Sequence, residues 1–319
     1  MARIVSLGSA LQDIYLIDRE DFSASAFGPE SIFGELHIGS KVDIDQIHYR
    51  VGGGGTNSAV EFARHGHESI LLANIGRDPA GDAVLARLDE ENVDTSYLSY
   101  TRRHTGCSII LLDAKTGERT ILTHRGASAK FDNLHEDDLD LIQPDWIYIT
   151  NLRGDLETLR LFIKKAKSIG TKVMLNPGAA ELSEKRHLLR FISDVDILLL
   201  NQYEAKRLVP GELLVEQLAH LSAYVSMVIL TAGSTGGIAT DGSEIFRFGL
   251  YEDVPVKDTT GAGDSFGSGF LAHLAADFSF KDSIIYASAN STSVVTYLGA
   301  QPGLLTGKED LHPMPIQLL

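Results

Sequence analysis

The stretch "VKDTTGAGDSFGSGFLAHLAA" at residues 256–276 combines a bare backbone with a carboxylate. After Asp264, apolar residues recur at helical spacing, at positions 266, 270, 271 and 274, which predicts a helix that begins near this acid. Gly261, Ala262 and Gly263 then lie at the helix N-terminus, where free N–H groups and the helix dipole attract anions. A carboxylate beside such an anion hole suits phosphoryl transfer, because it can accept the proton of an attacking hydroxyl group.

The simpler interpretation of Asp264 is structural, because an Asp at a helix start stabilises the helix by roughly 1 kcal/mol. The glycines before it favour the catalytic interpretation. Two other phosphate-binding motifs are excluded by spacing. The chain contains no GxxxxGK[ST] string, and "GAGDSFG" has the pattern GxGxxxG instead of the GxGxxG of dinucleotide-binding folds.

A second glycine run, Gly52–Gly55, precedes Thr56, Asn57 and a predicted helix at 58–66. By itself the run is compatible with a flexible turn, but a bare backbone also lets a ligand approach the main chain closely. Asp13 follows the first predicted strand. Its carboxylate can accept hydrogen bonds from two hydroxyl groups of a polyol; the alternative is an ordinary solvated acid at a strand end.

The elements that must position these residues alternate along the chain. Apolar strand-like runs followed by helical patterns predict βαβ units and a mainly parallel sheet. The predicted strands are 3–9, 69–76, 145–151, 172–178, 197–201 and 226–233, and the predicted helices are 58–66, 80–92 and a last long helical stretch at 264–298. Residues 312–319 are expected to form a tail. No linker or repeat divides the chain, so we expect one domain over residues 1–319.

Three segments depart from this rhythm. Residues 11–18, 42–51 and 107–123 alternate apolar and polar residues without an intervening helix. The third contains a "KTGE" turn, which is typical of a hairpin. We expect these segments to form a small sheet beside the main one, a lid, with an apolar face that mediates a homodimer.

Composition limits the partners. The net charge of −15 argues against binding nucleic acid or a membrane surface, since either needs clustered Lys and Arg. The single cysteine, Cys107, cannot form an intramolecular disulfide. The N-terminus lacks a signal-peptide pattern, and no apolar run is long enough to span a bilayer. We therefore expect a cytoplasmic protein.

Together the glycine motifs resemble the two signatures of the ribokinase-like (PfkB) carbohydrate kinase family. Four further segments match that family's order: "GRDPAGD" (76–82), "NQYE" (201–204), "TAGSTGG" (231–237) and "LGAQPGLLT" (298–306). The resemblance implies a three-layer α/β/α domain with a β lid. It also implies ATP-dependent phosphorylation of a sugar hydroxyl, with a primary hydroxymethyl group as the expected acceptor, and Asp264 as the base.

The resemblance also assigns binding residues. Asp13, Gly53, Gly54 and Asn57 would hold the sugar, although several ribokinases have Lys where Gly54 stands, which weakens an assignment to ribose. Asn201 and Glu204 would order Mg²⁺ and the phosphates through water, or simply cap a helix. The residues expected along the nucleotide are Thr231, Gly233 and Gly236, with Asn290 near the adenine or, equally, facing the core.

Asp258 and Thr260 resemble the loop that binds an activating monovalent cation in some relatives, so K⁺ is a candidate cofactor. The alternative is that Asp258 caps a turn or pairs with a lysine, and then no cation would matter. Arg103 and Arg125 could bind a substrate phosphate, but we interpret them, like His65 and His67, as surface residues.

Two other functions remain open. A nucleoside kinase of the same fold would need aromatic partners for a base, and the lid segments supply only Tyr15, His48 and Tyr49. A non-catalytic sugar-binding regulator would have no use for a general base at Asp264. The sequence does not name the acceptor.

Overall fold

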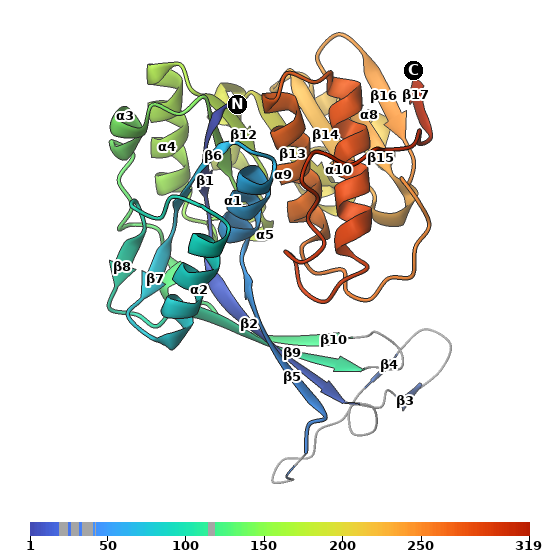
Figure 1. The fold of residues 1–319 in the computed structure, drawn as a ribbon. Coiled ribbons are helices and arrows are strands. Elements are labelled where there is room, and N and C mark those ends of the chain that lie inside the picture. Colours follow the sequence, from blue (N-terminus) through green and yellow to red (C-terminus); the bar gives the residue numbers. More distant parts are fainter. Residues whose placement is uncertain (19–24, 27–31, 34–40, 42, 114–118) are drawn as a thin grey trace.

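A computed structural model of the chain describes residues 1–18, 25–26, 32–33, 41, 43–113 and 119–319. Its centre is a nine-stranded sheet with the order β17-β16-β15-β14-β13-β12-β11-β1-β6 (Figure 1). Six strands pair in parallel, as the alternating pattern predicted: β1 (Arg3–Leu7), β6 (Glu68–Leu72), β11 (Trp146–Ile149), β12 (Lys172–Leu175), β13 (Ile197–Asn201) and β14 (Met227–Thr231).

The far edge of the sheet is antiparallel and includes the end of the chain. It consists of β15 (Gly237–Thr240), β16 (Ile245–Phe248) and β17 (Ile316–Leu318). The prediction of a tail at 312–319 was therefore wrong for the last residues. The edge of β16 offers unpaired backbone groups, and β17 pairs with them while Ile316 packs on the core.

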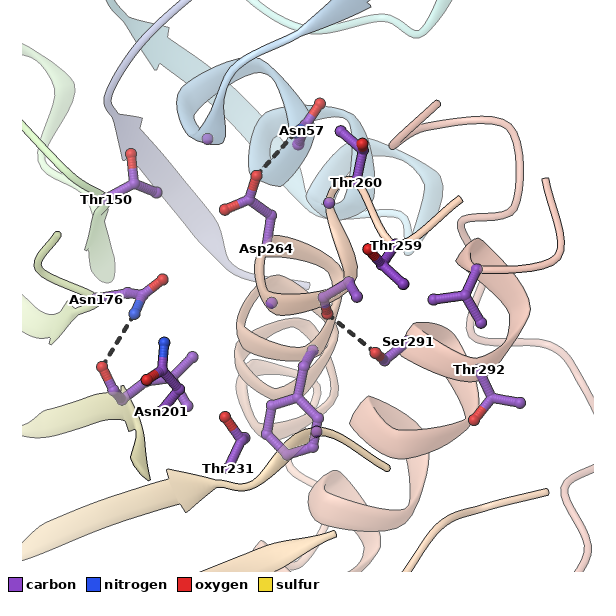
Figure 2. A pocket seen from close by; sticks show the side chains of 18 of the residues that line it. Asn57, Thr150, Asn176, Asn201, Thr231, Thr259, Thr260, Asp264, Ser291 and Thr292 are labelled. Atoms are coloured by element: carbon purple, nitrogen blue, oxygen red, sulfur yellow. Dashed lines mark hydrogen bonds between the residues drawn. The ribbon is translucent and has the colours of Figure 1, made fainter. Parts of the chain in front are cut away.

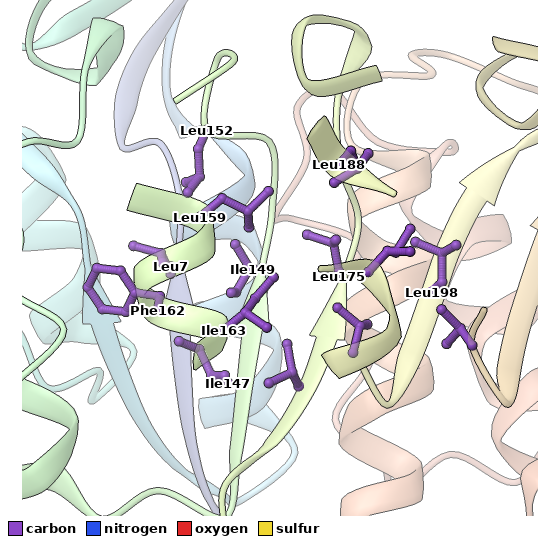
Figure 3. Packing of buried hydrophobic residues seen from close by; sticks show 14 of the residues in the cluster. Leu7, Ile147, Ile149, Leu152, Leu159, Phe162, Ile163, Leu175, Leu188 and Leu198 are labelled. Atoms are coloured by element: carbon purple, nitrogen blue, oxygen red, sulfur yellow. The ribbon is translucent and has the colours of Figure 1, made fainter. Parts of the chain in front are cut away.

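Helices cover both faces of the sheet because alternate residues of each strand point in opposite directions. Ile147 and Ile149 of β11 pack toward α3–α8, whereas Trp146 and Tyr148 pack toward α1, α9 and α10 (Figure 3 shows the first cluster). The helices of the first layer are α3 (Asp138–Ile142), α4 (Leu156–Ile169), α5 (Ala179–Ser183), α6 (Lys185–Leu188), α7 (Gln202–Leu208) and α8 (Leu214–Leu221). The other layer contains α1 (Gly54–Arg64), α2 (Pro79–Glu90), α9 (Ala262–Ala275) and α10 (Phe280–Val294).

Three predicted boundaries needed correction. Helix α1 begins at Gly54, not at residue 58, because contacts with the end of β1 outweigh the low helix propensity of glycine. The stretch 264–298 forms two helices, separated where Ser279 caps α10 through the Asp282 amide. The predicted strand 69–76 continues past β6 as the separate β7 (Asn74–Gly76), which pairs with β8 (Ser99–Thr101).

The three lid segments form one separate four-stranded sheet, in agreement with the prediction. The order is β10-β9-β2-β5, and the sheet projects away from the main domain (Figure 1). Its strands are β2 (Leu11–Asp18), β5 (Gln46–Gly52), β9 (Gly106–Asp113) and β10 (Arg119–His124). Residue 42 and the predicted turn at 115–118 lie outside the described residues. Two short strands, β3 (Ser25–Ala26) and β4 (Ile32–Phe33), pair with each other. Across the described ranges, no helix has both the length and the apolar character needed to cross a bilayer.

Candidate active site

A cavity of about 740 Å³ lies at the carboxyl ends of the parallel strands, between the lid sheet and the start of α9. Its volume is in the range of small-molecule sites. Residues that follow five neighbouring strands line it, so one wall extends from the lid to the antiparallel edge. These residues include Ser9 after β1, Thr150 after β11, Asn176 after β12, Asn201 at the end of β13 and Gly233 after β14 (Figure 2).

The start of α9 presents free backbone amides to this cavity. Gly261 is the N-cap with a φ of 81°, and a Cβ there would lie 2.2 Å from that of Ala300, so only glycine fits. The amide of Ala262 reaches the Thr259 carbonyl at 3.3 Å. The amide of Gly263 has no acceptor in the described part of the chain, and a Cβ on Gly263 would meet nothing within 4 Å. The predicted anion hole is therefore open at Gly263.

Asp264 lies in the first turn of α9 and is held by a residue from α1. Its Oδ2 accepts a hydrogen bond from Asn57 Nδ2 at 2.9 Å (Figure 2). Burial raises the pKa of Asp264, whereas the Asn57 bond and the charge of Arg153 lower it. The arrangement gives a carboxylate with one oxygen fixed and a basicity above that of a solvated Asp, which suits a general base.

Asn57, which was expected to hold the sugar, lines the cavity, and both ends of its amide contact protein. Besides donating to Asp264, it accepts a hydrogen bond from Gln301 Nε2 at 3.3 Å. The side chain is 3% exposed. These contacts indicate that Asn57 orients Asp264.

Arg153 is a charged cavity residue that sequence reasoning missed. It follows β11 and has a φ of 63°, a conformation that is uncommon for a residue with a side chain. Buried Glu181 holds the loop, since its Oε1 accepts the amides of Leu152 and Gly154, each at 2.8 Å. Asn151 Oδ1 accepts the Arg153 amide at 2.8 Å. The signal that could have revealed it is the polar "NLRGD" directly after a buried strand, at the edge where parallel sheets bind ligands.

The lid end of the cavity contains Asp13, which is 5% exposed. Burial raises its pKa to about 6, and a hydrogen bond from Ser108 partly opposes this rise. Gly53 and Gly54 lie beside it along the cavity wall. A Cβ on Gly54 would lie 2.8 Å from Thr150 Oγ1, so Thr150 fills the space that a lysine would enter in several ribokinases.

The other end of the cavity contains the residues predicted to bind the nucleotide. Thr231, Gly233 and Gly236 all line it. Asn201 and Glu204 line it too, and they cap α7 reciprocally: Asn201 Oδ1 accepts the Glu204 amide at 3.0 Å, and Glu204 Oε2 accepts the Asn201 amide at 2.9 Å. Burial raises the pKa of Glu204. The capping alternative therefore holds, without removing either residue from the cavity.

Asn290 faces the core. It is fully buried, donates to the Ser265 carbonyl at 2.8 Å and accepts the Leu305 amide at 2.8 Å. These contacts favour the core-facing alternative, and the position of Asn290 near an adenine stays a prediction. Its helix face packs on α9 and on the segment after α10.

Asp258 and Thr260 lie in the loop before α9. Asp258 is 2% exposed, and its Oδ1 accepts the Thr260 amide at 2.9 Å, so it caps the turn, as one alternative predicted. Arg103 and Arg125 are exposed, as expected. His67 is not a surface residue: it is 7% exposed, accepts the Ala2 amide and contacts the Ala272 carbonyl.

Comparisons with known proteins agree with this geometry. A model of the pfkB family of carbohydrate kinases matches residues 1–306. The ribokinase of Haemophilus influenzae is 30% identical over 277 residues, which cover 84% of this chain and 87% of that protein. The ATP-dependent 6-phosphofructokinase of Thermoanaerobacterium thermosaccharolyticum is 27% identical over 275 residues, which cover 82% and 84% of the two chains.

Solved structures share the fold. A ribokinase from Arabidopsis thaliana, complexed with ribose and ATP, superposes with a TM-score of 0.77 at 23% identity, over 96% of each chain. A nucleoside kinase from Methanocaldococcus jannaschii superposes with a TM-score of 0.75 at 23% identity, over 95% of each chain. These similarities confirm the predicted three-layer fold with its small separate sheet.

Proposed function

The chain belongs to the pfkB family of carbohydrate kinases, and from this premise we propose how its residues transfer a phosphoryl group from ATP to a hydroxymethyl group of a sugar. Membership makes the chain a transferase that uses ATP and phosphorylates a sugar hydroxyl. The observation that carries the residue-level proposal is the juxtaposition of Asp264 with the open amide of Gly263 in one cavity wall.

Asp264 is the proposed general base. Asn57 fixes Oδ2, so Oδ1 is the oxygen that takes the proton of the acceptor hydroxyl. As the hydroxyl oxygen bonds to the γ-phosphorus, the bond from that phosphorus to the bridging oxygen breaks, and ADP leaves with the electron pair. The raised pKa of Asp264 makes it a better proton acceptor than a solvated Asp.

Gly263 and Arg153 are proposed to stabilise the transferring phosphoryl group. Gly263 lines the cavity, and its amide has no acceptor in the described part of the chain, at the positive end of α9. Arg153 approaches from the loop after β11, which lies between the strands of the lid end and those of the nucleotide end. A planar guanidinium matches two phosphoryl oxygens, and hydrogen bonds to Glu181 and Asn151 hold the loop that carries it.

The nucleotide is proposed to lie along Thr231, Gly233 and Gly236. Mg²⁺ is proposed as cofactor, because the Glu204 carboxylate and the polar cavity wall suit an ion that keeps several waters. When bound, the ion neutralises charge on the nucleotide phosphates. For K⁺, the contacts of Asp258 support the alternative of a capped turn with a basic partner, so K⁺ is left out of the proposed reaction.

The acceptor is proposed to lie between Asp13 and Asp264, along the Gly53–Gly54 backbone. The nucleoside alternative finds little support at this end, because the apolar lid residues that line it are aliphatic: Leu11, Ile110 and Ile121. Tyr15 is buried and bonded to Asp258, and Tyr49 is 59% exposed. The aromatic lining residues Phe248, Tyr251 and Phe266 lie at the nucleotide end.

The lid is proposed to mediate a homodimer. Tyr49, Ile14, Ile109 and Leu122 form one row across its four strands. Tyr49, Ile109 and Leu122 are 59%, 37% and 54% exposed, which makes this row an apolar patch suited to a second copy. A dimer by light scattering that dissociates in Ile109→Lys supports the proposal, and a monomeric wild type contradicts it.

We also propose that residues 1–319 form a single domain and that the protein is cytoplasmic, where ATP and Mg²⁺ are plentiful.

The function is tested by ADP release from ATP and Mg²⁺ with a panel of sugars, sugar phosphates and nucleosides, using Asp264→Asn as the matched control. We expect release that depends on a sugar acceptor and is lost in the variant. Release with nucleosides alone would establish the alternative. Binding of a sugar without release of ADP would indicate a regulator instead of a kinase.

A further inference from the structure

Asp258 is a buried acid directly before the loop that forms the anion hole. Its side chain is inaccessible to solvent. Oδ2 accepts hydrogen bonds from the Tyr15 hydroxyl at 2.8 Å and the Gly299 amide at 3.0 Å, and Oδ1 accepts the Thr260 amide at 2.9 Å. These three donors are neutral, so they orient the carboxylate without cancelling its charge. A buried charge is costly unless an opposite charge and hydrogen bonds accompany it.

Arg119, the first residue of lid strand β10, supplies that positive charge. Its Nε lies 3.8 Å from Asp258 Oδ1, and its Nη2 donates a hydrogen bond to Thr259 Oγ1. The guanidinium therefore contacts two consecutive residues just before Gly261, the N-cap of α9. Within the described residues, Arg119 is the cationic side chain found within 4 Å of this carboxylate.

The position of Arg119 conflicts with a bound monovalent cation. An ion on the Asp258 carboxylate would lie close to the guanidinium, and the two positive charges would repel in a poorly solvated site. The three hydrogen bonds to the carboxylate would also compete with the ion for oxygen lone pairs. The residues present therefore do not fit a K⁺ site while Arg119 is in place.

We propose that Arg119 is a built-in cation for the loop 258–263, so that turnover requires no monovalent metal ion. The proposal deepens the proposed kinase function and rests on it. Arg119 acts as a positioning residue: it fixes the loop that carries the Gly263 amide and touches no reacting atom. A free ion would bind independently of the lid, whereas Arg119 is itself part of lid strand β10.

The lid is therefore fastened to the anion hole at Asp258. Tyr15 of β2 and Arg119 of β10 contact the same carboxylate from two strands of the lid sheet. Asp13, two residues before Tyr15 on β2, faces the acceptor end of the cavity. An acceptor that positions β2 through Asp13 thus helps to place both contacts to the loop that binds the phosphoryl group.

The test compares wild type, Arg119→Ala and Arg119→Lys in potassium, sodium and tetramethylammonium chloride at equal ionic strength. Arg186→Ala is the matched control, because Arg186 is an exposed arginine on α6, far from the cavity lining. Two quantities are measured in each salt: kcat/KM by ADP release, and the melting temperature, which does not depend on turnover.

Wild type, Arg119→Lys and Arg186→Ala should show the same kcat/KM and melting temperature in all three salts. Arg119→Ala should lose about tenfold or more in tetramethylammonium, the scale of a lost charged contact. K⁺ should restore part of this loss and raise the melting temperature of Arg119→Ala alone, because Asp258 and the buried Thr260 hydroxyl could then receive the ion.

Activation of the wild type by K⁺ would overturn the proposal, as would an Arg119→Ala variant with wild-type activity in every salt. If kcat/KM falls in Arg119→Ala and K⁺ does not restore it, the proposed role of the Arg119 positive charge is wrong. If Arg119→Ala fails to fold, Arg119→Met, which keeps the aliphatic stem, takes its place. Absence of ADP release by the wild type with every acceptor would refute the kinase function, while the melting temperatures would still test Arg119.

Discussion

The two glycine-rich helix starts of this protein look alike in sequence and differ in structure. Helix α1 begins after Gly53 and α9 after Gly261, and both glycines have a positive φ, 102° and 81°. Both starts line the same cavity, and the Asn57–Asp264 hydrogen bond joins them. From these similarities, both first turns could be expected to bind a ligand.

The two helix starts differ in the space that is available for a Cβ atom at their glycines. At α1, a Cβ on Gly53 or Gly55 would lie 2.4 Å from the Ser9 carbonyl oxygen or 2.8 Å from the Gly8 carbonyl carbon. At α9, a Cβ on Gly263 would meet nothing within 4 Å. At Gly53 and Gly55 the protein's own backbone fills the space, whereas at Gly263 the space is open. This difference agrees with the proposal that the start of α9 takes part in the transfer, and it indicates that Gly53 and Gly55 serve packing.

Asp264→Asn should have the largest effect, because it removes the base at the α9 start. We expect kcat to fall about 10²–10⁴-fold. Binding of ATP and sugar, measured by calorimetry, should remain largely intact, since the Asn57 contact can persist. A decrease in kcat of less than tenfold would contradict the assignment of the base.

Gly263→Ala should lower activity without lowering stability, because the space beside Gly263 is open. The methyl group enters the open part of the anion hole, so we expect kcat/KM for ATP to fall about 10²-fold, the scale of a lost oxyanion contact. The melting temperature should stay the same or rise, because alanine is the better helix former. An active variant would show that the phosphoryl group does not approach Gly263.

Asp13→Ala should raise KM for the sugar far more than KM for ATP, because Asp13 lies at the acceptor end. Losing a charged hydrogen-bond partner costs about 1.5–3 kcal/mol, which corresponds to roughly 10–100-fold. Steady-state kinetics with each substrate varied in turn measures both constants. Equal changes in the two would remove Asp13 from the acceptor site.

Gly55→Ala is the counterpart of Gly263→Ala at the other helix start. The added Cβ would meet backbone atoms of Gly8 and Ser9, which cannot rotate away, so we expect a loss of about 1–3 kcal/mol in the free energy of unfolding. Denaturant unfolding of the two variants side by side measures the difference. If Gly55→Ala were as stable as wild type, the contrast between the two starts would fail.

The pH dependence should give the smallest effect. The folded-state pKa of Asp13 is raised from 3.8 to about 6, so below pH 6 the carboxyl group is protonated and binds hydroxyl groups less well. We expect kcat/KM for the sugar to fall about fivefold from pH 6 to pH 5, and this step to vanish in Asp13→Asn. For stability the sign is opposite: the contribution of Asp13 is full below pH 4 and is lost as pH rises through 6. A Asp13→Asn variant that keeps the step would assign it to another group.

Local sequence was enough for the framework and for the helix start at Asp264. Hydrophobic periodicity predicted the parallel strands and the lid strands, because a residue's face depends only on its neighbours in the same element. The motif around Asp264 predicted a helix start with glycines before it, because N-terminal amides are free in any helix. The glycine motifs also carried the resemblance to the family.

Tertiary structure decided the rest, since contacts between distant segments have no local signature. Arg153 enters the cavity because Glu181, 28 positions later, holds its loop in a left-handed turn. Asn290 faces the core, where its side-chain oxygen accepts a hydrogen bond from the Leu305 amide after α10. Arg119 contacts Asp258 because the lid sheet brings β10 beside the loop before α9. In each case the chain fixes which group is present, and packing across the fold fixes what that group can touch.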